Sequence, residues 1–194
     1  MFIQTEETPN PLTLKFLPGR DVLGQKKDTE RLGVSFSAGE RCDHAPLAGR
    51  ILKVQGITGV YLGVDFISIT KNADSEWMAL KPALLGIIMD HYIHNMPIWT
   101  DPNSLETTQN KEDEGPKSAI WTQIHEIIET RVRPAVAQDG GDIRFCSFEN
   151  GIVYVKMYGA CSGCPSSTQT LKSGIENMLR YYVPEVQEVQ QIMD

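Results

Sequence analysis

A polar, acidic segment near the middle of the chain restricts the folds that the 194 residues can form. Residues 97–117, PIWTDPNSLETTQNKEDEGPK, contain three prolines, five acidic residues and two basic residues, with no apolar residue after Leu105. Such a segment buries too little apolar surface to join a core, and it is typical of a solvated tether. We therefore predict two small domains, residues 1–96 and 118–194, joined by an acidic flexible linker over residues 97–117.

The first of these domains shows strand and helix patterns in alternation. An extended run at 13–17 ends in a Pro-Gly turn, and a proline at position 46 suits the first turn of a helix. The predicted elements are strands at 13–17, 59–63 and 65–71, a helix at 46–55, and a helix along Leu84–Ile93 with Pro82 at or before its first turn. This order predicts an α+β domain with a small antiparallel sheet.

The second domain begins with a helix whose apolar stripe runs from Ile120 to Val132, and Pro134 should kink or restart it. Two glycines in Asp139–Asp142 then stop the helix, because adjacent glycines permit the positive φ of a helix end. The predicted remainder is a strand at 143–148, a turn at 149–151, a strand at 152–158, a cysteine loop and a final helix along Leu171–Val183. The fold class is again α+β.

Composition excludes several classes of function. With 18 basic and 25 acidic residues the net charge is −7, and we find no basic cluster for nucleic acid. The longest apolar run, at 83–89, is too short to cross a bilayer. Residues 1–7 resemble neither a secretory signal nor a transit peptide. Four unevenly spaced cysteines do not form a disulfide framework, which favours a reducing compartment.

The pair Cys161 and Cys164, spaced as CxxC, is the strongest chemical signal. Such a pair can cycle between dithiol and disulfide, supply half of a zinc site, or supply half of an iron–sulfur site. Pro165 is well placed to begin a helix, whose N-terminal amides would favour a Cys164 thiolate.

The ligand count separates these alternatives only in part. A cluster held by thiolates needs four, yet Cys146 falls within a predicted strand and Cys42 lies in the other domain. A second copy of the loop, in a two-fold dimer, is the simplest completion. A thioredoxin-like CxxC follows a parallel strand in a βαβ unit, and here a hairpin precedes the loop, which disfavours the redox alternative. A zinc-stabilised module remains open.

Motifs in both halves resemble the Nfu family of iron–sulfur cluster carriers. In the second half they are Asp139-Gly140-Gly141-Asp142, Gly159-Ala160-Cys161-Ser162-Gly163-Cys164-Pro165-Ser166-Ser167, Thr170-Leu171-Lys172-Ser173-Gly174-Ile175-Glu176 and Val183-Pro184-Glu185-Val186. In the first half they are Thr8-Pro9-Asn10-Pro11, Lys15-Phe16-Leu17-Pro18-Gly19, Pro46-Leu47-Ala48, Gly63–Lys71, Trp77 and Leu80-Lys81-Pro82. The resemblance covers nearly the whole chain except the linker, and it implies an Nfu N-terminal domain followed by a NifU-like domain.

This resemblance carries expectations about function. A cluster, [4Fe–4S] in the family, would be held between two subunits by Cys161 and Cys164 and passed to apo iron–sulfur proteins after delivery by upstream assembly proteins. Transfer would be thiolate exchange at an exposed, weakly braced site, with no enzymatic reaction. The N-terminal domain would help to choose or hold targets. The resemblance further suggests a bacterial, mitochondrial-type member acting in the cytoplasm.

Other candidate residues are expected to be structural. Asp139–Asp142 is interpreted as a helix stop, with carboxylates near the cluster as the alternative. Cys146 is expected to be a partly buried strand residue, and Cys42 to have no metal role. His91 and His94 are expected to lie on the surface near a helix end.

Overall fold

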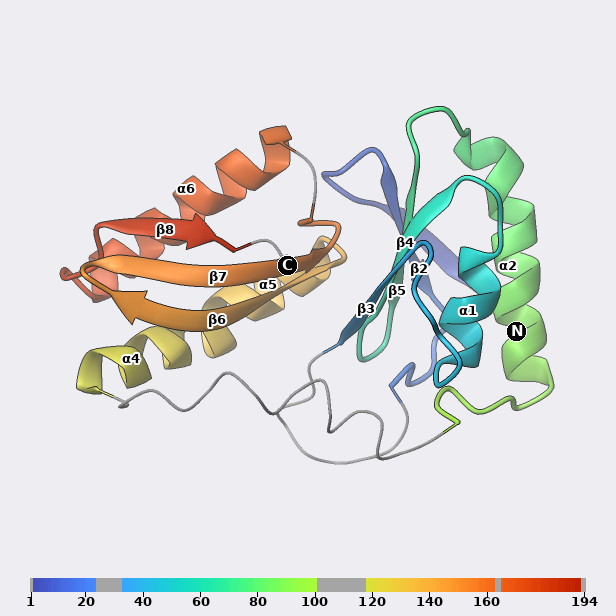
Figure 1. The fold of residues 1–194 in the computed structure, drawn as a ribbon, viewed down its shortest axis with the longest axis horizontal. Helices are drawn as coiled ribbons and strands as arrows, with labels where there is room; N and C mark the ends of the chain where they lie inside the picture. Colours follow the sequence, from blue (N-terminus) through green and yellow to red (C-terminus); the bar gives the residue numbers. More distant parts are fainter. Residues whose placement is uncertain (1, 24–32, 101–117, 163–164, 193–194) are drawn as a thin grey trace. The chain divides into compact units, whose positions relative to one another are not determined.

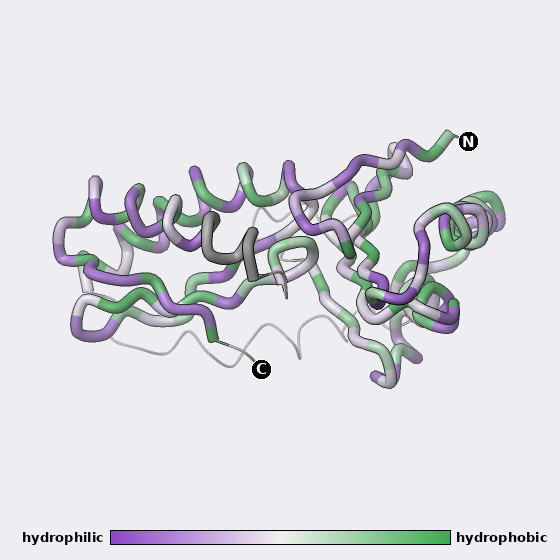
Figure 2. The backbone as a smooth tube through the Cα atoms, turned by 90° about the horizontal axis from the view of Figure 1, so that it is seen from above, coloured by the Kyte–Doolittle hydropathy of each residue, from purple (hydrophilic) through white to green (hydrophobic). Residues whose placement is uncertain are grey.

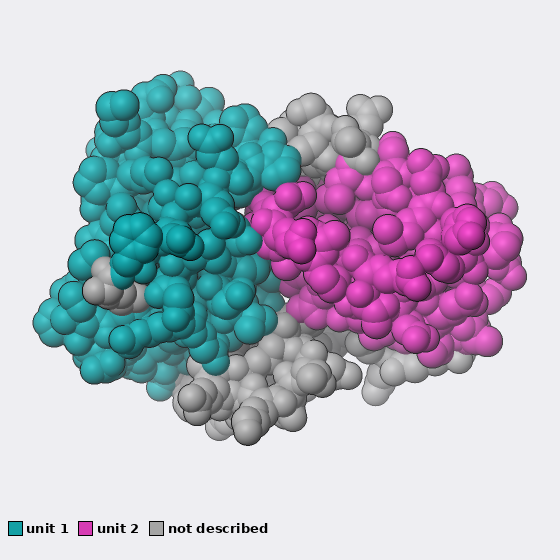
Figure 3. Space-filling view, turned by 180° about the vertical axis from the view of Figure 1, so that it is seen from behind, with its two compact units in different colours: residues 1–105 teal, residues 106–194 magenta. Residues whose placement is uncertain are grey.

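The computed structural model describes residues 2–23, 33–100, 118–162 and 165–192, with the backbone alone for residues 165–170. The chain divides into two compact units, residues 1–105 and 106–194 (Figure 3). Each unit has its own sheet, helices and apolar core, which confirms the predicted α+β class. No helix among the described residues is long and apolar enough to span a bilayer.

The N-terminal unit is built on a five-stranded antiparallel sheet in the order β1-β2-β5-β4-β3 (Figure 1). Strand β2 has the predicted limits, whereas the edge strands β1 and β3 were not predicted. The strands are β1 (Gln4–Glu7), β2 (Thr13–Leu17), β3 (Val34–Ser37), β4 (Ile57–Leu62) and β5 (Ile67–Lys71).

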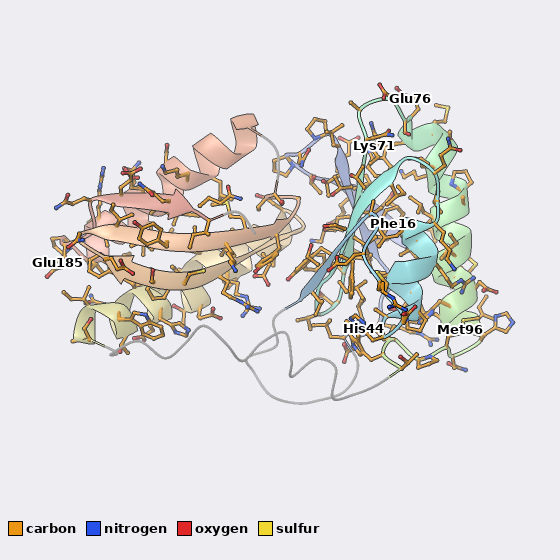
Figure 4. The ribbon with its side chains drawn as sticks, viewed as in Figure 1. Phe16, His44, Lys71, Glu76, Met96 and Glu185 are labelled. Atoms are coloured by element: carbon orange, nitrogen blue, oxygen red, sulfur yellow. The ribbon has the colours of Figure 1, made fainter. Side chains whose placement is uncertain are left out.

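Two helices, α1 (Pro46–Leu52) and α2 (Trp77–Ile93), cover one face of this sheet (Figure 1). Between them and the sheet lies the core, which includes the fully buried Phe16 of β2 (Figure 4). Figure 2 shows hydrophobic and hydrophilic residues alternating along the elements of both units, the pattern that lets each element bury one side.

Helix α2 corrects two predictions. It begins at Trp77, so Pro82 lies inside it and not at its start. Pro82 has no amide hydrogen, so the carbonyl of Met78, four residues earlier, has no helical hydrogen-bond partner. Met78 is 89% exposed, so solvent can reach that turn of the helix. His91, predicted at the surface, is fully buried, while His94 is exposed as predicted.

The N-terminal unit continues past the predicted boundary at residue 96. The Trp99 indole nitrogen donates to the Leu23 carbonyl (3.1 Å). The Trp99 ring stacks on the ring of His44, with 6.2 Å between the ring centroids. The Thr100 amide donates to the His44 carbonyl (3.0 Å). Residues 98–100 therefore belong to the folded unit, contrary to the predicted linker start at 97. Residues 101–117 lie outside the described residues, and their linker character stays a prediction.

The C-terminal unit has a three-stranded sheet in the order β6-β7-β8. Its helices contact one another, for example where the Gln123 side chain donates to the Tyr182 carbonyl (3.1 Å), so they share a face of the sheet. The elements are α4 (Ala119–Ile127), η2 (Ile128–Val132), α5 (Arg133–Gln138), β6 (Gly141–Glu149), β7 (Ile152–Gly159), α6 (Pro165–Tyr182) and β8 (Glu188–Gln191).

The first helix of this unit is interrupted by a π-helical segment, η2, in which the Arg133 amide donates to the Ile128 carbonyl. Pro134 explains the interruption, since it has no amide to continue the α-helical pattern, and the helix restarts as α5. The predicted kink or restart at Pro134 is thereby confirmed, together with its position.

Strand β8 corrects the predicted topology. It pairs parallel to β7, with Val153 opposite Val189, so β7, α6 and β8 form a βαβ unit. The predicted absence of such a unit was wrong, because the short polar strand Glu-Val-Gln-Gln carries no strong strand pattern. The cysteine loop therefore follows a strand that has a parallel neighbour.

Candidate functional site

The cysteine loop leaves the end of β7 in a tight turn. Gly159 adopts a positive φ of 62°, and the Ser162 amide donates to its carbonyl (3.1 Å). The Ala160 amide donates to the Gly140 carbonyl (3.0 Å). Cys161 is thereby held beside the turn that joins α5 to β6. Cys164, the second predicted ligand, lies outside the described residues, so the predicted effect of the α6 N-terminus on its thiol stays a prediction.

The turn beside Cys161 is the Asp-Gly-Gly-Asp motif at 139–142. Helix α5 ends there as predicted, with the Gly140 amide donating to the Ala137 carbonyl (3.1 Å) and Gly140 at a φ of 76°. Gly141 then begins β6 and pairs with Gly159 across the sheet. The motif is therefore a helix stop, and it also forms one wall of the site around Cys161.

Gly141 is required by space and not by backbone angle. A Cβ placed on Gly141 would lie 2.3 Å from the Cys161 sulfur and 3.2 Å from the Cys161 backbone nitrogen. Real Cβ atoms do not approach other atoms that closely. The sulfur of Cys161 thus packs directly on the backbone of β6, a contact that sequence reasoning missed.

A buried ion pair braces the start of β6. Arg133 Nε donates to Asp142 Oδ1 (2.8 Å) and a terminal guanidinium nitrogen donates to Oδ2 (3.2 Å). The other terminal nitrogen donates to Glu129 Oε2 (2.8 Å). The side chains of Arg133 and Asp142 are only 15% and 7% exposed. Sequence analysis gave Arg133 no role, because its partner lies on a different element.

Cys161 itself is buried, with 7% exposure, and belongs to the apolar core of its unit. Burial, together with the negative charges of Asp139 and Asp142, raises the pKa of its thiol to about 12. The expectation of an exposed site is therefore wrong for Cys161. Asp139 and Asp142 thus lie near enough to act on the Cys161 thiol, while the alternative interpretation of Asp139–Asp142, carboxylates near the cluster, stays a prediction.

The remaining cysteines lie elsewhere. Cys146 is half-buried on β6, five residues beyond Gly141, which corresponds to roughly 17 Å along a strand. Cys42 packs against the N-terminal core, and its thiol donates to the Glu40 carbonyl (3.5 Å). Among the residues that the structure describes, no three Cys, His, Asp or Glu side chains are grouped to hold a metal ion.

The N-terminal unit contributes a shallow groove of about 410 Å³ between β1, the turn that follows it and the first turns of α2. Trp77, Lys81 and Glu7 are among its lining residues. The lining contains neither cysteine nor histidine. The groove therefore lacks the thiolate and imidazole ligands that iron–sulfur sites use.

Both halves of the chain match known families. Residues 3–95 match the family described as "Scaffold protein Nfu/NifU N terminal", and residues 124–190 match the NifU-like domain. The two matches follow the order expected from the sequence motifs.

Full-length similarity extends to curated proteins of flies. The "NFU1 iron-sulfur cluster scaffold homolog, mitochondrial" of Drosophila sechellia is 44% identical over 194 residues, which is 100% of this chain and 66% of that protein. The protein of the same name from Drosophila virilis is also 44% identical, again over 100% of this chain and 62% of its own length. The chain thus spans slightly less than two thirds of these relatives.

Solved structures show weaker likeness. The solution structure of a NifU-like protein from Saccharomyces cerevisiae matches with a TM-score of 0.45 at 23% identity, over 52% of this chain and 86% of that one. A crystal structure of a Staphylococcus aureus protein matches with a TM-score of 0.38 at 24% identity, over 45% of this chain and 99% of that one.

These relatives overturn one expectation. The sequence motifs suggested a bacterial cytoplasmic protein, whereas the curated proteins that match the whole chain are named mitochondrial. The expected cytoplasmic location is therefore contradicted.

Proposed function

The chain belongs to the Nfu/NifU family, with an Nfu N-terminal domain and a NifU-like domain, and on this premise we propose that it carries iron–sulfur clusters as cargo. The observation that carries the proposal is the position of the CxxC pair. Cys161 closes the turn after β7 within the NifU-like match at 124–190, and α6 begins directly after Cys164. Relatives that match the whole chain are named iron–sulfur cluster scaffolds.

The proposed ligands are Cys161 and Cys164 from each of two subunits. Four thiolates hold a typical cluster, and one chain brings two to the loop. Cys146 lies five residues along β6 from Gly141, and Cys42 packs on the core of the other unit, so neither is proposed as a ligand. A cluster-bridged homodimer satisfies the count, and the family resemblance favours [4Fe–4S] as the cluster.

Transfer is proposed to occur by thiolate exchange, in which cysteines of a recipient replace those of the carrier one at a time. The partners are then apo iron–sulfur proteins as recipients and upstream assembly proteins as donors. No substrate bond is made or broken, so the protein is not an enzyme. The N-terminal unit, whose groove is lined by neither cysteine nor histidine, is proposed to help hold recipients.

A thiol–disulfide oxidoreductase is the second candidate, because β7, α6 and β8 place the CxxC after a strand with a parallel neighbour. The burial of Cys161 opposes this alternative, since attack on a disulfide requires an accessible thiolate. Reduction of insulin disulfides by the metal-free protein, lost in Cys161→Ser, would favour the oxidoreductase.

Anaerobic reconstitution with ferrous iron, sulfide and a thiol reductant tests the carrier. Wild type is compared with Cys161→Ser, Cys164→Ser, Cys42→Ser and Cys146→Ser by visible absorbance, iron and sulfide content, and native mass. We expect a brown dimer with one cluster, lost only in the first two variants. A colourless monomer, or a cluster that depends on Cys42 or Cys146, would contradict the bridged site.

A further inference from the structure

We propose that Arg133 is a positioning residue that controls how readily the Cys161 sulfur leaves its buried place, acting through Asp142 and the start of β6. The proposed effect of Arg133 on the exposure of Cys161 is inferred from the contacts between these residues alone. Its consequence for cluster exchange rests on the proposed function. We refer to Arg133, Asp142 and Gly141 together as the β6 clamp.

The Arg133–Asp142 pair is a strong contact. Both carboxylate oxygens of Asp142 accept from Arg133, at 2.8 and 3.2 Å, which is a two-point contact that lysine cannot reproduce. Both side chains are largely buried, so solvent screens the pair little. Removing Arg133 would leave the buried Asp142 carboxylate without its guanidinium partner, which is strongly unfavourable.

The same pair is bonded to the backbone of β6. Asp142 Oδ1 also accepts from the Ile143 amide at 2.8 Å, so one carboxylate binds the guanidinium and the strand at once. Asp142 lies opposite Tyr158, and Gly141 lies opposite Gly159. The carboxylate thereby ties the first residues of β6 to α5, while backbone pairing holds the same residues against the end of β7.

The backbone at the start of β6 contacts Cys161. The sulfur packs so tightly on Gly141 that a Cβ there would lie 2.3 Å away. On the other side of Cys161, the Ala160 amide donates to the Gly140 carbonyl. The start of β6 thus covers the sulfur, and for Cys161 to reach a cluster or a recipient it must separate from this backbone.

The position of Arg133 in its helix is set by the π-helical segment that precedes it. Arg133 is the first residue of α5, and its own amide completes the π-type bond to Ile128. The same side chain reaches back to Glu129, one turn earlier. Arg133 therefore joins the helix layer to the strand that covers the sulfur.

Alkylation of the metal-free full chain by N-ethylmaleimide tests the clamp directly. A Cys42→Ser, Cys146→Ser, Cys164→Ser background leaves Cys161 as the one thiol, and mass spectrometry follows its modification at constant pH. We expect Arg133→Gln to accelerate modification at least tenfold, and Arg133→Lys to recover part of the protection.

Two variants separate positioning from general destabilisation. Glu129→Gln removes the charge of the other carboxylate partner of Arg133, which belongs to η2 and not to β6, and should change the rate less than twofold. Val189→Ala leaves a cavity in the core at β8, which pairs with the end of β7 that is far from Gly159. This variant should accelerate modification only in proportion to the fraction of molecules that it unfolds. If the alkylation rate of Arg133→Gln, corrected for its unfolded fraction, equals that of Val189→Ala or that of wild type, the clamp does not control Cys161.

A second measurement uses the loaded protein with its natural cysteines. Arg133→Gln should lose its cluster to a ferrous-iron chelator several-fold faster than wild type and Glu129→Gln, with an unchanged visible spectrum. If wild type itself takes up no cluster, the proposed function fails, while the alkylation rates still decide whether the clamp exists. If loss rates are equal although Arg133→Gln alkylates faster, the link from the clamp to exchange is wrong.

Discussion

The sulfur of Cys161 lies where a side chain on Gly141 would have to be. The two residues are twenty positions apart in sequence, and the pairing of Gly141 with Gly159 brings them into contact. The backbone of Gly141 does not adopt the positive φ that usually explains a glycine in a turn, as Gly140 does at 76°. In the Asp-Gly-Gly-Asp motif, Gly141 thus leaves space for the Cys161 sulfur, and Gly140 provides the positive φ that the turn needs.

Gly141→Ala should destabilise the C-terminal unit by about 1–3 kcal/mol, the usual cost of forcing an extra carbon into a packed site. Urea unfolding followed by Trp121 fluorescence, in a Trp77→Phe, Trp99→Phe background, measures this change. Gly174→Ala on α6 is the matched control, because its Cβ would meet nothing within 4 Å. That control should gain about 0.5–1 kcal/mol from the better helix former. Equal effects of the two substitutions would contradict the close contact.

His91 should make the N-terminal unit sensitive to acid. Neither ring nitrogen has a hydrogen-bond partner among the described residues, and the side chain is fully buried. Burial, aided by the charge of Arg50 and opposed by that of Asp90, lowers the pKa of His91 below its ordinary 6.5. As the pH falls below 6.5, His91 therefore takes up a proton in the unfolded state before it does so in the folded state. The free energy of unfolding of this unit consequently falls as the pH falls.

His91→Leu should remove this loss and stabilise the unit by about 1 kcal/mol even at neutral pH, because two unpaired buried nitrogens disappear. Unfolding at pH 5 to 8, followed by Trp77 and Trp99 in a Trp121→Phe background, compares the slopes. His94→Gln alters an exposed histidine and keeps the buried one, so it should retain the acid-dependent loss. An unchanged slope in His91→Leu would show that another group causes the acid sensitivity.

Trp99 should stabilise the N-terminal unit although it lies in the segment predicted as linker. Its ring packs against Phe36 and His44, and its indole nitrogen donates to the Leu23 carbonyl. Trp99→Ala should cost about 2–3 kcal/mol, and Trp99→Phe, which keeps an aromatic ring and loses the hydrogen bond, about 1 kcal/mol. Circular dichroism during urea unfolding measures both, and no change in Trp99→Ala would mean that residues 98–100 do not support the unit.

Metal removal should leave the C-terminal unit folded. Its core contains fully buried residues from three helices and the sheet, including Ile124, Ile143 and Leu179, so we expect this core to hold the fold without a metal. Far-ultraviolet circular dichroism should be unchanged after exhaustive dialysis against EDTA. Unfolding under chelation would instead favour the zinc-stabilised module that CxxC spacing alone allows.

Predictability from sequence followed the strength of local signals. Strand β2, the proline-led start of α1 and the turn at Asn150-Gly151, with φ of 51° and 83°, were all predicted because turn residues and apolar alternation coincide there. Strands β1, β3 and β8 were missed, since each has four residues and lies at a sheet edge, where few positions need to be apolar. Without β8, the βαβ unit around the cysteine loop was also missed.

The candidate site shows the same limit. The CxxC pair could be recognised from its spacing, and the Asp-Gly-Gly-Asp turn from its glycines. The burial of Cys161, its contact with Gly141 and the Arg133–Asp142 pair depend on residues brought together only by the tertiary fold. Likewise, the burial of His91 follows from the position of α2 on the sheet and not from any pattern near its helix end.

The π-helical segment has a consequence for how this region tolerates insertions and deletions. Each residue advances an α-helix by about 100° of rotation. In η2, however, the Arg133 amide donates to the carbonyl five residues earlier, so deleting one intervening residue would turn this bond into the ordinary α-helical one. Arg133 would still lie over the carbonyl of Ile128, and its side chain would keep its direction toward Asp142. Loss of one residue within η2 would therefore leave the clamp in place, whereas the same deletion in the regular turns of α5 would rotate every later residue of the helix by about 100°.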